Sequence, residues 1–331
     1  MNTSQLGAYS LAHQRAAVFQ PPQAGCLRIT GADRVAFLQR QTTNDVTQLQ
    51  PGRTVLTVLT SPSARILDVL YLLDEKPLAE DEPAIYIVPL PGLATQTYRY
   101  LKSRIFFMDQ VRVTDLSIEI VYLDLLGPQA EHALRELGLE DLPGSNQSRE
   151  FLWGADTLIC LGLDPQLGLG WRLIFQTNCF KALTTRLKAL DVGTLDAAVY
   201  DALRIEAGLP AAGFELTDEF TPLETGLVHT VSQSKGCYTG QEVLARQVNY
   251  EKVTQTLCGL LLDQSLPTGQ QLYCDGRPAG KITSVASSPR LGWIALAVVK
   301  RPFNQAGIGL SLSSTNQVGS LKVCELPFSL S

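Results

Sequence analysis

The sequence predicts an α+β fold in which a multi-lobed body precedes a small C-terminal β-barrel. Up to about residue 250, stretches with strand and helix periodicity alternate and include hairpins, which is typical of α+β proteins. After Val253, short strand-like stretches are separated by Gly, Pro and Ser turns, which is typical of a closed barrel. With 331 residues, the chain is long enough for several hydrophobic cores. We therefore expect a body over residues 1–250 and a barrel over residues 253–331.

Composition and charge exclude several classes of protein. Hydrophobic residues make up 45% of the chain and charged residues 18%, as in ordinary globular domains. A net charge of −5 gives no general attraction to nucleic acids or anionic membranes. No apolar run reaches the roughly 18 residues of a membrane span, and the first residues lack the features of a signal peptide. We expect a cytoplasmic protein that binds neither nucleic acid directly nor a membrane.

The cysteines do not indicate a metal site. The chain has seven cysteines and three histidines, with no Cys-x-x-Cys pair and no histidine at ligand spacing from a cysteine. We therefore expect no zinc site and no protein-held iron–sulfur cluster, and most of the thiols should be buried and reduced.

The first lobe should contain a β-hairpin over residues 55–59 and 66–73. It follows a strand at 26–30, a helix opened by Gly31-Ala32-Asp33 and a turn at 42–46. Asp68 interrupts the apolar run of the second hairpin strand, and a carboxylate buried there needs a partner. Alternatively, the strand lies at an edge of the sheet and Asp68 faces solvent.

The same order of strands and helices repeats farther along the chain. A charged loop at 75–83 precedes a strand at 84–88, a helix at 92–105 and a strand at 111–115. The helix ends in Arg99, Lys102 and Arg104, which we interpret as a solvated basic face. A second lobe should begin near residue 115, with strands near 118–123, 157–161 and 170–175 and helices near 128–137 and 180–190.

The next helix should span residues 195–207, capped by Gly193-Thr194 and ended by Gly208 and Pro210. A step of roughly 100° per residue puts Glu206 near the centre of its apolar face and Arg204 roughly opposite. A carboxylate in a packed interface needs a hydrogen-bonding partner, which is either a protein group or a ligand.

The most distinctive stretch is Lys-Gly-Cys-Tyr-Thr-Gly-Gln-Glu at residues 235–242. Thr239 and Glu242 have the spacing of a capping box, so a helix should begin here, and the two glycines allow tight turns. Cys237 would then precede a helix N-terminus, near Lys235 and Arg246, where the thiolate form is favoured. The alternative is a well-capped helix whose cysteine is a small core residue.

Residues 235–242 resemble the signature of the YgfZ family of folate-binding proteins, which is linked to iron–sulfur cluster maintenance. That family is related to the T-protein, the aminomethyltransferase of the glycine cleavage system. Further resemblances to T-proteins are Arg-x-Glu-Ala-Gly at 204–208, Thr-Pro-x-Glu at 221–224 and the Gly-Lys-Ile-Thr-Ser stretch at 280–284. The resemblance implies ferredoxin-like α+β lobes and a barrel around a central folate opening.

The resemblance also implies roles for individual residues. Glu206 matches the glutamate that holds the pterin end of folate. Asp68 matches the first acid of an Asp-Asp pair thought to act at the folate, while Val69 stands at the second position. Cys237 would be a working thiol, and Lys235, Tyr238 and Arg246 would contact tetrahydrofolate or another reduced folate.

Three functions are compatible with these residues. The first is a YgfZ-like, tetrahydrofolate-binding protein that supports the synthesis or repair of iron–sulfur enzymes, including those of tRNA modification, with iron–sulfur client or assembly proteins as partners. The second is a folate-dependent aminomethyltransferase of the glycine cleavage type. The third is a folate-sensing scaffold without catalysis. The cysteine motif favours the first function, and Asp68 keeps the second open.

Overall fold

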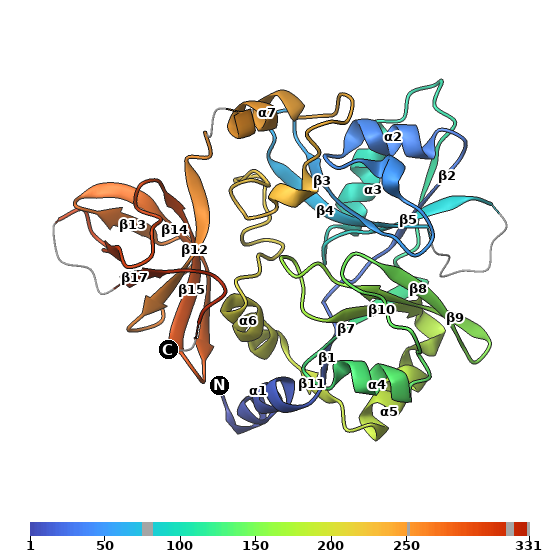
Figure 1. The fold of residues 1–331 in the computed structure, drawn as a ribbon, viewed down its shortest axis with the longest axis horizontal. Helices are drawn as coiled ribbons and strands as arrows, with labels where there is room; N and C mark the ends of the chain where they lie inside the picture. Colours follow the sequence, from blue (N-terminus) through green and yellow to red (C-terminus); the bar gives the residue numbers. More distant parts are fainter. Residues whose placement is uncertain (75–81, 250–251, 316–320, 330–331) are drawn as a thin grey trace.

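The computed structural model describes residues 1–74, 82–249, 252–315 and 321–329 and confirms the α+β fold with a C-terminal barrel. Figure 1 shows the two sheets of the body side by side and the barrel separated from them by helix α6 (Ala197–Glu206). Most of the charged loop expected at 75–83 lies outside the described residues.

The first lobe is a five-stranded sheet with strand order β3-β4-β5-β2-β6. Its strands are β2 (Leu27–Thr30), β3 (Val55–Thr60), β4 (Ile66–Leu73), β5 (Ala84–Val88) and β6 (Arg112–Asp115), and its helices are α2 (Arg34–Gln41), α3 (Ala94–Ser103) and the 3₁₀ turn η1 (Val46–Gln48). The expected hairpin over 55–73 is confirmed as β3 and β4.

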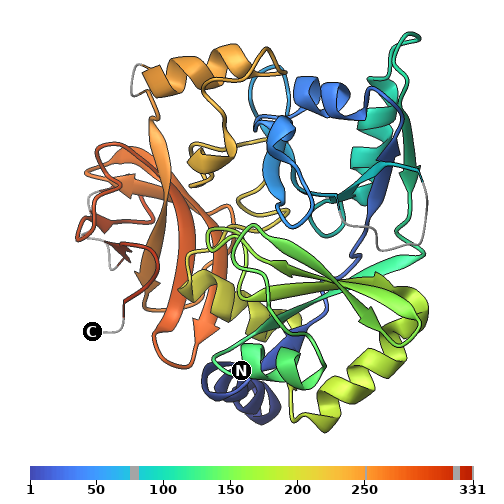
Figure 2. The ribbon, with the colours of Figure 1, turned by 45° about the vertical axis from the view of Figure 1, so that its right-hand side comes forward.

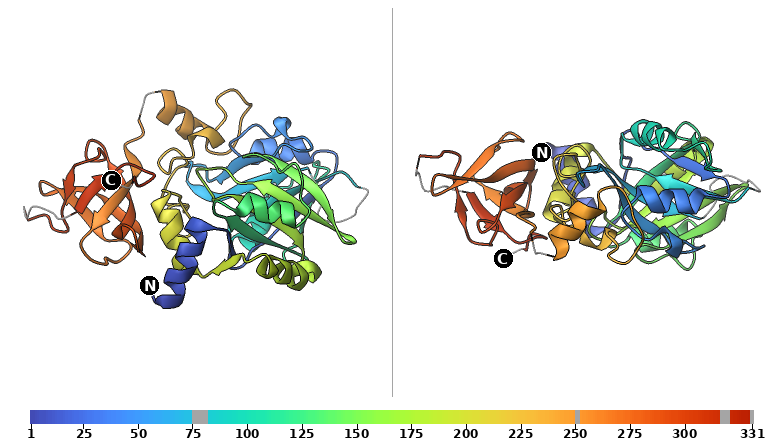
Figure 3. Two further views of the ribbon diagram at one scale, coloured as in Figure 1. Left: turned by 60° about the horizontal axis from the view of Figure 1, so that its bottom comes forward. Right: turned by 90° about the horizontal axis from the view of Figure 1, so that it is seen from above.

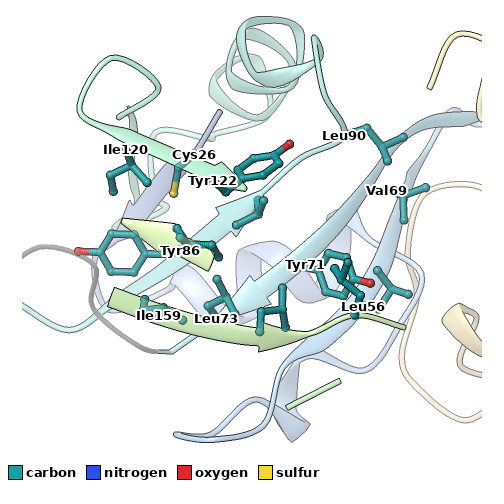
Figure 4. Close-up of a cluster of buried hydrophobic side chains, with 14 of the residues drawn as sticks. Cys26, Leu56, Val69, Tyr71, Leu73, Tyr86, Leu90, Ile120, Tyr122 and Ile159 are labelled. Atoms are coloured by element: carbon teal, nitrogen blue, oxygen red, sulfur yellow. The ribbon is translucent and has the colours of Figure 1, made fainter. Parts of the chain in front are cut away.

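Both faces of this sheet are buried, which explains its nearly continuous apolar strands. Leu70 and Leu72 of β4 pack in the cluster that includes residues of α2 and α3, whereas Val69 and Tyr71 pack in the cluster shared with the second sheet. Figure 4 shows Val69, Tyr71 and Leu73 in that second cluster together with Tyr122 from the second lobe. Strand alternation therefore assigns Asp68 to the α3 side.

The second lobe is a six-stranded sheet with strand order β11-β1-β7-β10-β9-β8. The strands are β1 (Ala17–Phe19), β7 (Ile120–Leu126), β8 (Ser148–Trp153), β9 (Asp156–Gly162), β10 (Trp171–Gln176) and β11 (Gly193–Leu195), and the helices are α4 (Ala130–Glu136), α5 (Phe180–Ala189) and the 3₁₀ turn η2 (Thr177–Cys179). The chain passes from the first sheet to the second between Asp115 and Ile120, and the N-terminal strand β1 also joins the second sheet.

The N-terminal helix α1 (Thr3–Gln14) was not anticipated from the sequence. Asn2 and Gln5 form its capping box, in which each side chain accepts a hydrogen bond from the backbone N–H of the other. Tyr9 and Ala12 of α1 are buried and pack against α6 and the barrel.

Helix α6 begins later than the sequence suggested. Gly193 and Thr194 belong to strand β11, and the cap is Asp196, whose carboxylate accepts a hydrogen bond from the Val199 N–H at 2.9 Å. The position of the cap is corrected because Asp is a stronger N-cap than the Gly-Thr pair that precedes it.

The barrel follows a long irregular segment that contains η3 (Val228–Thr230) and α7 (Gln241–Asn249). Its strand order is β13-β14-β15-β12-β17-β16, with β12 (Gln255–Leu262), β13 (Gln271–Cys274), β14 (Arg277–Ser288), β15 (Gly292–Lys300), β16 (Gly309–Leu310) and β17 (Leu321–Cys324). The other views show α6 and α1 lying between this barrel and the body (Figures 2 and 3). No helix in the described part of the chain could cross a membrane.

Candidate functional site

A cavity of about 290 Å³ lies where both lobes and helix α6 meet. Its walls are mostly apolar and come from β4, the end of β5, β7, β10, α6 and the loop after α6. The lining residues are Phe19, Pro21, Pro22, Val69, Tyr71, Val88, Pro89, Leu90, Pro91, Asp124, Leu163, Leu167, Arg172, Ala197, Tyr200, Asp201, Arg204, Leu209, Pro210, Ala211, Ala212 and Phe214. An apolar enclosure with a few convergent polar groups is typical of a small-molecule site.

The first polar group of the cavity is an ion pair between Asp124 and Arg172. The Arg172 guanidinium donates to both Asp124 oxygens, from Nε at 2.7 Å and from Nη2 at 2.9 Å, and it lies 4.1 Å from the ring centroid of Tyr122. Both side chains are almost completely buried. Burial by itself would lower the pKa of Arg172, but the charge and hydrogen bonds of Asp124 together with the nearby Tyr122 and Tyr71 raise it. The pair is therefore a fixed, charged part of the wall.

The second polar group comes from the cavity face of α6. Arg204 is 3% exposed and donates to Asp201 Oδ1 at 2.5 Å, to the Leu209 carbonyl at 3.2 Å and to Ser284 Oγ of the barrel at 3.0 Å. Glu215 lies 3.5 Å from Arg204 and accepts the Ser284 hydroxyl at 2.6 Å. This network joins α6, the following loop and the barrel, and it leaves the Asp201 carboxylate 37% exposed.

Asp68 is buried and faces away from the cavity. Its carboxylate accepts hydrogen bonds from the backbone N–H of Val69 at 2.7 Å and of Leu90 at 3.0 Å, and from the Thr97 hydroxyl of α3. Burial raises its pKa to about 7, although these donors favour the charged form. The edge-strand alternative is corrected, because β4 lies between β3 and β5 and Asp68 is fully buried. The next residue on β4, Val69, lines the cavity, and so does Tyr71.

Glu206 lies on a different face of α6 from the cavity. It accepts the Tyr9 hydroxyl of α1 at 2.7 Å and lies 3.5 Å from His13 Nε2. Glu206 and His13 line a separate surface pocket together with Arg290 of the barrel. The carboxylate therefore has protein partners, which was one of the two possibilities left open by the sequence. Arg204, which the helical wheel placed opposite the buried face, is itself buried because α6 packs on several sides.

The loop at residues 232–240, which we call the cysteine loop, packs against the first lobe rather than into the cavity. The Lys235 ammonium donates to the carbonyls of Thr42 at 2.8 Å and Asn44 at 2.6 Å. Burial lowers the Lys235 pKa to about 8. Tyr238 is buried in a small cluster with Ala64, Leu223 and Leu244. Neither Lys235 nor Tyr238 lines the cavity, and the folate contacts expected of them stay predictions.

The helix after the cysteine loop begins at Gln241, two residues after Thr239. Glu242 is then the second residue of the helix, not the third after a Thr239 cap, so the expected capping box is corrected. Its Oε1 accepts from Arg246 Nη2 at 2.6 Å. Arg246 is exposed and lies outside the cavity lining. Gly240 has a φ of +85°, and a Cβ on it would lie 2.8 Å from the Ser61 carbonyl oxygen. The other glycine, Gly236, has open space around it.

Cys237 is exposed, whereas the other six cysteines are buried or half-buried. The interpretation of Cys237 as a core residue is therefore corrected. Burial raises the pKa of Cys26 and Cys160 to about 12. Cys237 does not line the central cavity. In the described ranges, no three His, Cys, Asp or Glu side chains gather around a common metal position. The expectation that the chain holds neither zinc nor an iron–sulfur cluster stays a prediction.

Sequence reasoning missed the residues that form the polar part of the cavity. Asp124 and Arg172 interrupt apolar strands in the same way as Asp68, and that pattern is the signal that would have identified them. Asp201 has no such signal, because it is one of several polar residues on a helix.

Comparisons with known proteins found similar proteins that cover nearly the whole chain. The model of the GCVT N-terminal domain matches residues 8–162, and the model of the glycine cleavage T-protein C-terminal barrel domain matches residues 255–329. The chain is 30% identical over 307 residues to a chloroplastic protein of Arabidopsis thaliana that carries the name of a transferase. The match covers 92% of this chain and 69% of that relative.

The chain is also similar to proteins named aminomethyltransferase. It is 27% identical over 332 residues to the one from Desulforamulus reducens, which covers 95% of this chain and 86% of that relative. The crystal structure of the glycine cleavage system aminomethyltransferase T from Bartonella henselae superposes with a TM-score of 0.84 at 24% identity. That superposition covers 98% of this chain and 89% of the other, and at this identity it shows the fold.

Proposed function

The chain belongs to the glycine cleavage T-protein family, and from this premise we propose that its central cavity binds the pterin ring of tetrahydrofolate. The observation that carries the proposal is the cavity itself, an apolar enclosure of about 290 Å³ with one partly exposed carboxylate, Asp201, on its wall. This volume suits a bicyclic ring rather than a whole folate, so the aminobenzoyl-glutamate tail would extend out of the cavity.

Each polar group has a separate part in this proposal. Both oxygens of Asp124 already accept from Arg172, so this pair shapes the wall and supplies a fixed dipole. Among described residues, the hydrogen bonds of the Asp201 side chain come from Arg204 and use Oδ1. Oδ2 of Asp201 is then the acceptor for the N–H donors of a pterin ring. In this proposal Asp201 makes the contact with the pterin ring that the family resemblance implied for Glu206.

The reaction proposed for this site is one-carbon transfer of the aminomethyltransferase type. Relatives across nearly the whole chain carry that name, and bound tetrahydrofolate would supply the nitrogen that accepts a one-carbon unit. Asp68 would act as a positioning residue, because its hydrogen bonds hold the backbone of Val69 and Leu90 in the cavity wall. Its carboxylate does not itself reach the cavity.

Calorimetric competition tests the binding proposal. We expect tetrahydrofolate and a tetrahydropterin fragment to compete for one site, and p-aminobenzoylglutamate to leave the titration unchanged. Competition by the tail fragment alone, or no heat with tetrahydrofolate, would contradict it.

For the reaction, the purified chain is mixed with tetrahydrofolate and an aminomethylated lipoyl carrier, and ammonia and methylenetetrahydrofolate are measured. If the chain binds tetrahydrofolate but forms neither product, the binding proposal stands and the transfer proposal is wrong.

The exposure of Cys237 favours a second candidate, the support of iron–sulfur enzymes by a YgfZ-like protein. An exposed thiol in a loop fixed by Lys235 and Tyr238 is suited to contact a partner protein. Cells that lack this chain are complemented with the wild type or with Cys237→Ala, and an iron–sulfur enzyme is assayed. Equal enzyme activity in the two strains would remove this candidate, and alkylation of Cys237 well before the other thiols checks that it is accessible.

A further inference from the structure

The turn after α3 exposes three consecutive large apolar side chains. Phe106, Phe107 and Met108 are 67%, 98% and 74% exposed. Figures 1 and 2 show this teal segment projecting from the upper right of the molecule, beyond the rest of the first lobe. A contiguous exposed apolar group of this kind is a common sign of an interaction site.

The geometry of the turn directs its negative charge inward. Asp109 accepts the Phe106 N–H at 2.9 Å and the Arg40 guanidinium at 2.8 Å, while the Asp109 N–H donates to the Phe106 carbonyl at 3.0 Å. Asp109 is the only carboxylate between Tyr98 and Arg112 in the sequence. The apolar tip at 106–108 therefore carries no charge of its own.

Basic residues flank the tip on both sides in the sequence. Arg99, Lys102, Arg104 and Arg112 are all exposed, and none of them forms an ion pair with a carboxylate in the part of the chain that the structure describes. The Lys102 ammonium lies 5.4 Å from the Tyr98 ring centroid and the Arg104 guanidinium 4.9 Å from that of Tyr100, which holds both cations near the surface of α3.

We propose that residues 99–112 form a docking surface for anionic phospholipid membranes, with the tip at 106–108 entering the interface and the four cations facing lipid phosphates. Charge selects an anionic surface, although the whole chain carries −5. The three uncharged side chains of the tip can enter lipid without burying a charge. Buried apolar area and attraction to anionic lipids add in reversible membrane binding, and this surface offers both. This departs from the expectation of no membrane binding, which rested on net charge and on the lack of a spanning segment.

Vesicle sedimentation and lipid quenching test the proposal on the full chain. Vesicles of phosphatidylcholine with about one-third phosphatidylglycerol should bind the protein at least tenfold more tightly than pure phosphatidylcholine, and added salt should weaken that binding. Phe107→Ser and Arg104→Glu should each reduce binding at least fivefold. Leu152→Ser, at another site that is 87% exposed, should leave it unchanged. A tryptophan introduced as Phe107→Trp should be quenched by brominated lipid, and one introduced as Leu152→Trp should not.

Two outcomes would overturn the proposal. One is an equal affinity of wild type and Phe107→Ser for the anionic vesicles, including the case in which neither binds. The other is a dimer in sedimentation velocity that Phe107→Ser dissociates, which would assign the tip to a second copy of the chain. Circular dichroism of each variant confirms that it is folded, so a loss of binding reports on the surface.

Discussion

Buried charges are stabilised by different partners in the central cavity and in the cysteine loop. In the cavity, Arg172 and Asp124 come from different strands and neutralise each other within an apolar wall. In the cysteine loop, the buried Lys235 ammonium is held by two backbone carbonyls of the first lobe, and the adjacent Cys237 stays exposed. The cavity wall is thus stabilised by a pair of side-chain charges on neighbouring strands, whereas the loop is held by backbone groups of the first lobe and by close backbone approach at Gly240.

The largest effect should come from breaking the cavity pair. Arg172→Met leaves the Asp124 carboxylate buried without its partner, and we expect a loss of about 3–5 kcal/mol in the free energy of unfolding. Urea denaturation measures this loss. The double variant Arg172→Met/Asp124→Leu should recover most of it, because it removes the uncompensated charge. A double variant as unstable as the single one would show that the pair is not what stabilises this wall.

In the cysteine loop, backbone shape should matter more than charge. Gly240→Ala places a methyl group at a positive φ and against the Ser61 carbonyl, so we expect a loss of about 2 kcal/mol in the free energy of unfolding. Gly236→Ala is the matched control, and it should change stability by less than about 0.5 kcal/mol because nothing lies near its Cβ. Equal losses in the two variants would mean that the loop is not held by the contact at Gly240.

The pH dependence of stability distinguishes Asp68 from a solvent-facing acid. The folded-state pKa of about 7 lies above the ordinary unfolded value of about 3.9, so the folded protein binds the extra proton between these values. This contribution to stability is complete below about pH 4 and is lost as the pH rises through 7. Relative to Asp68→Asn, the wild type should lose at most about 1.4 kcal/mol per pH unit in that window. Denaturation curves of the two proteins at pH 5, 6, 7 and 8 provide the comparison, and a constant difference between them would contradict the burial argument.

The fold was largely readable from the sequence because periodicity is a local property. The hairpin β3–β4 and the barrel strands after Val253 follow from alternating apolar residues and turn residues. The strands β1, β8, β11 and β16 and the helix α1 escaped detection, since three of these strands have only two or three residues and α1 has a weakly amphipathic sequence.

The site was less predictable because its residues are far apart in the chain. Val69, Asp124, Arg172 and Asp201 meet only when two sheets and α6 pack together, and no local pattern records that contact. The short motifs, in contrast, led to Glu206 and Lys235, which the structure uses to join elements. Strand alternation predicts that Asp68 and Val69 lie on opposite faces of the sheet, but it does not predict which face borders the cavity.

The central claim, that the cavity face of α6 holds the pterin ring, is tested most directly by comparing two carboxylates of the same helix. Calorimetric titration with tetrahydrofolate is performed on Asp201→Asn and Glu206→Gln, with thermal unfolding to confirm that both variants are folded. We predict that Asp201→Asn weakens binding by about 1.5–3 kcal/mol, roughly 10- to 150-fold, and that Glu206→Gln binds within about twofold of the wild type. Full affinity in Asp201→Asn with a large loss in Glu206→Gln would contradict the account and move the folate to the α1 side of the helix.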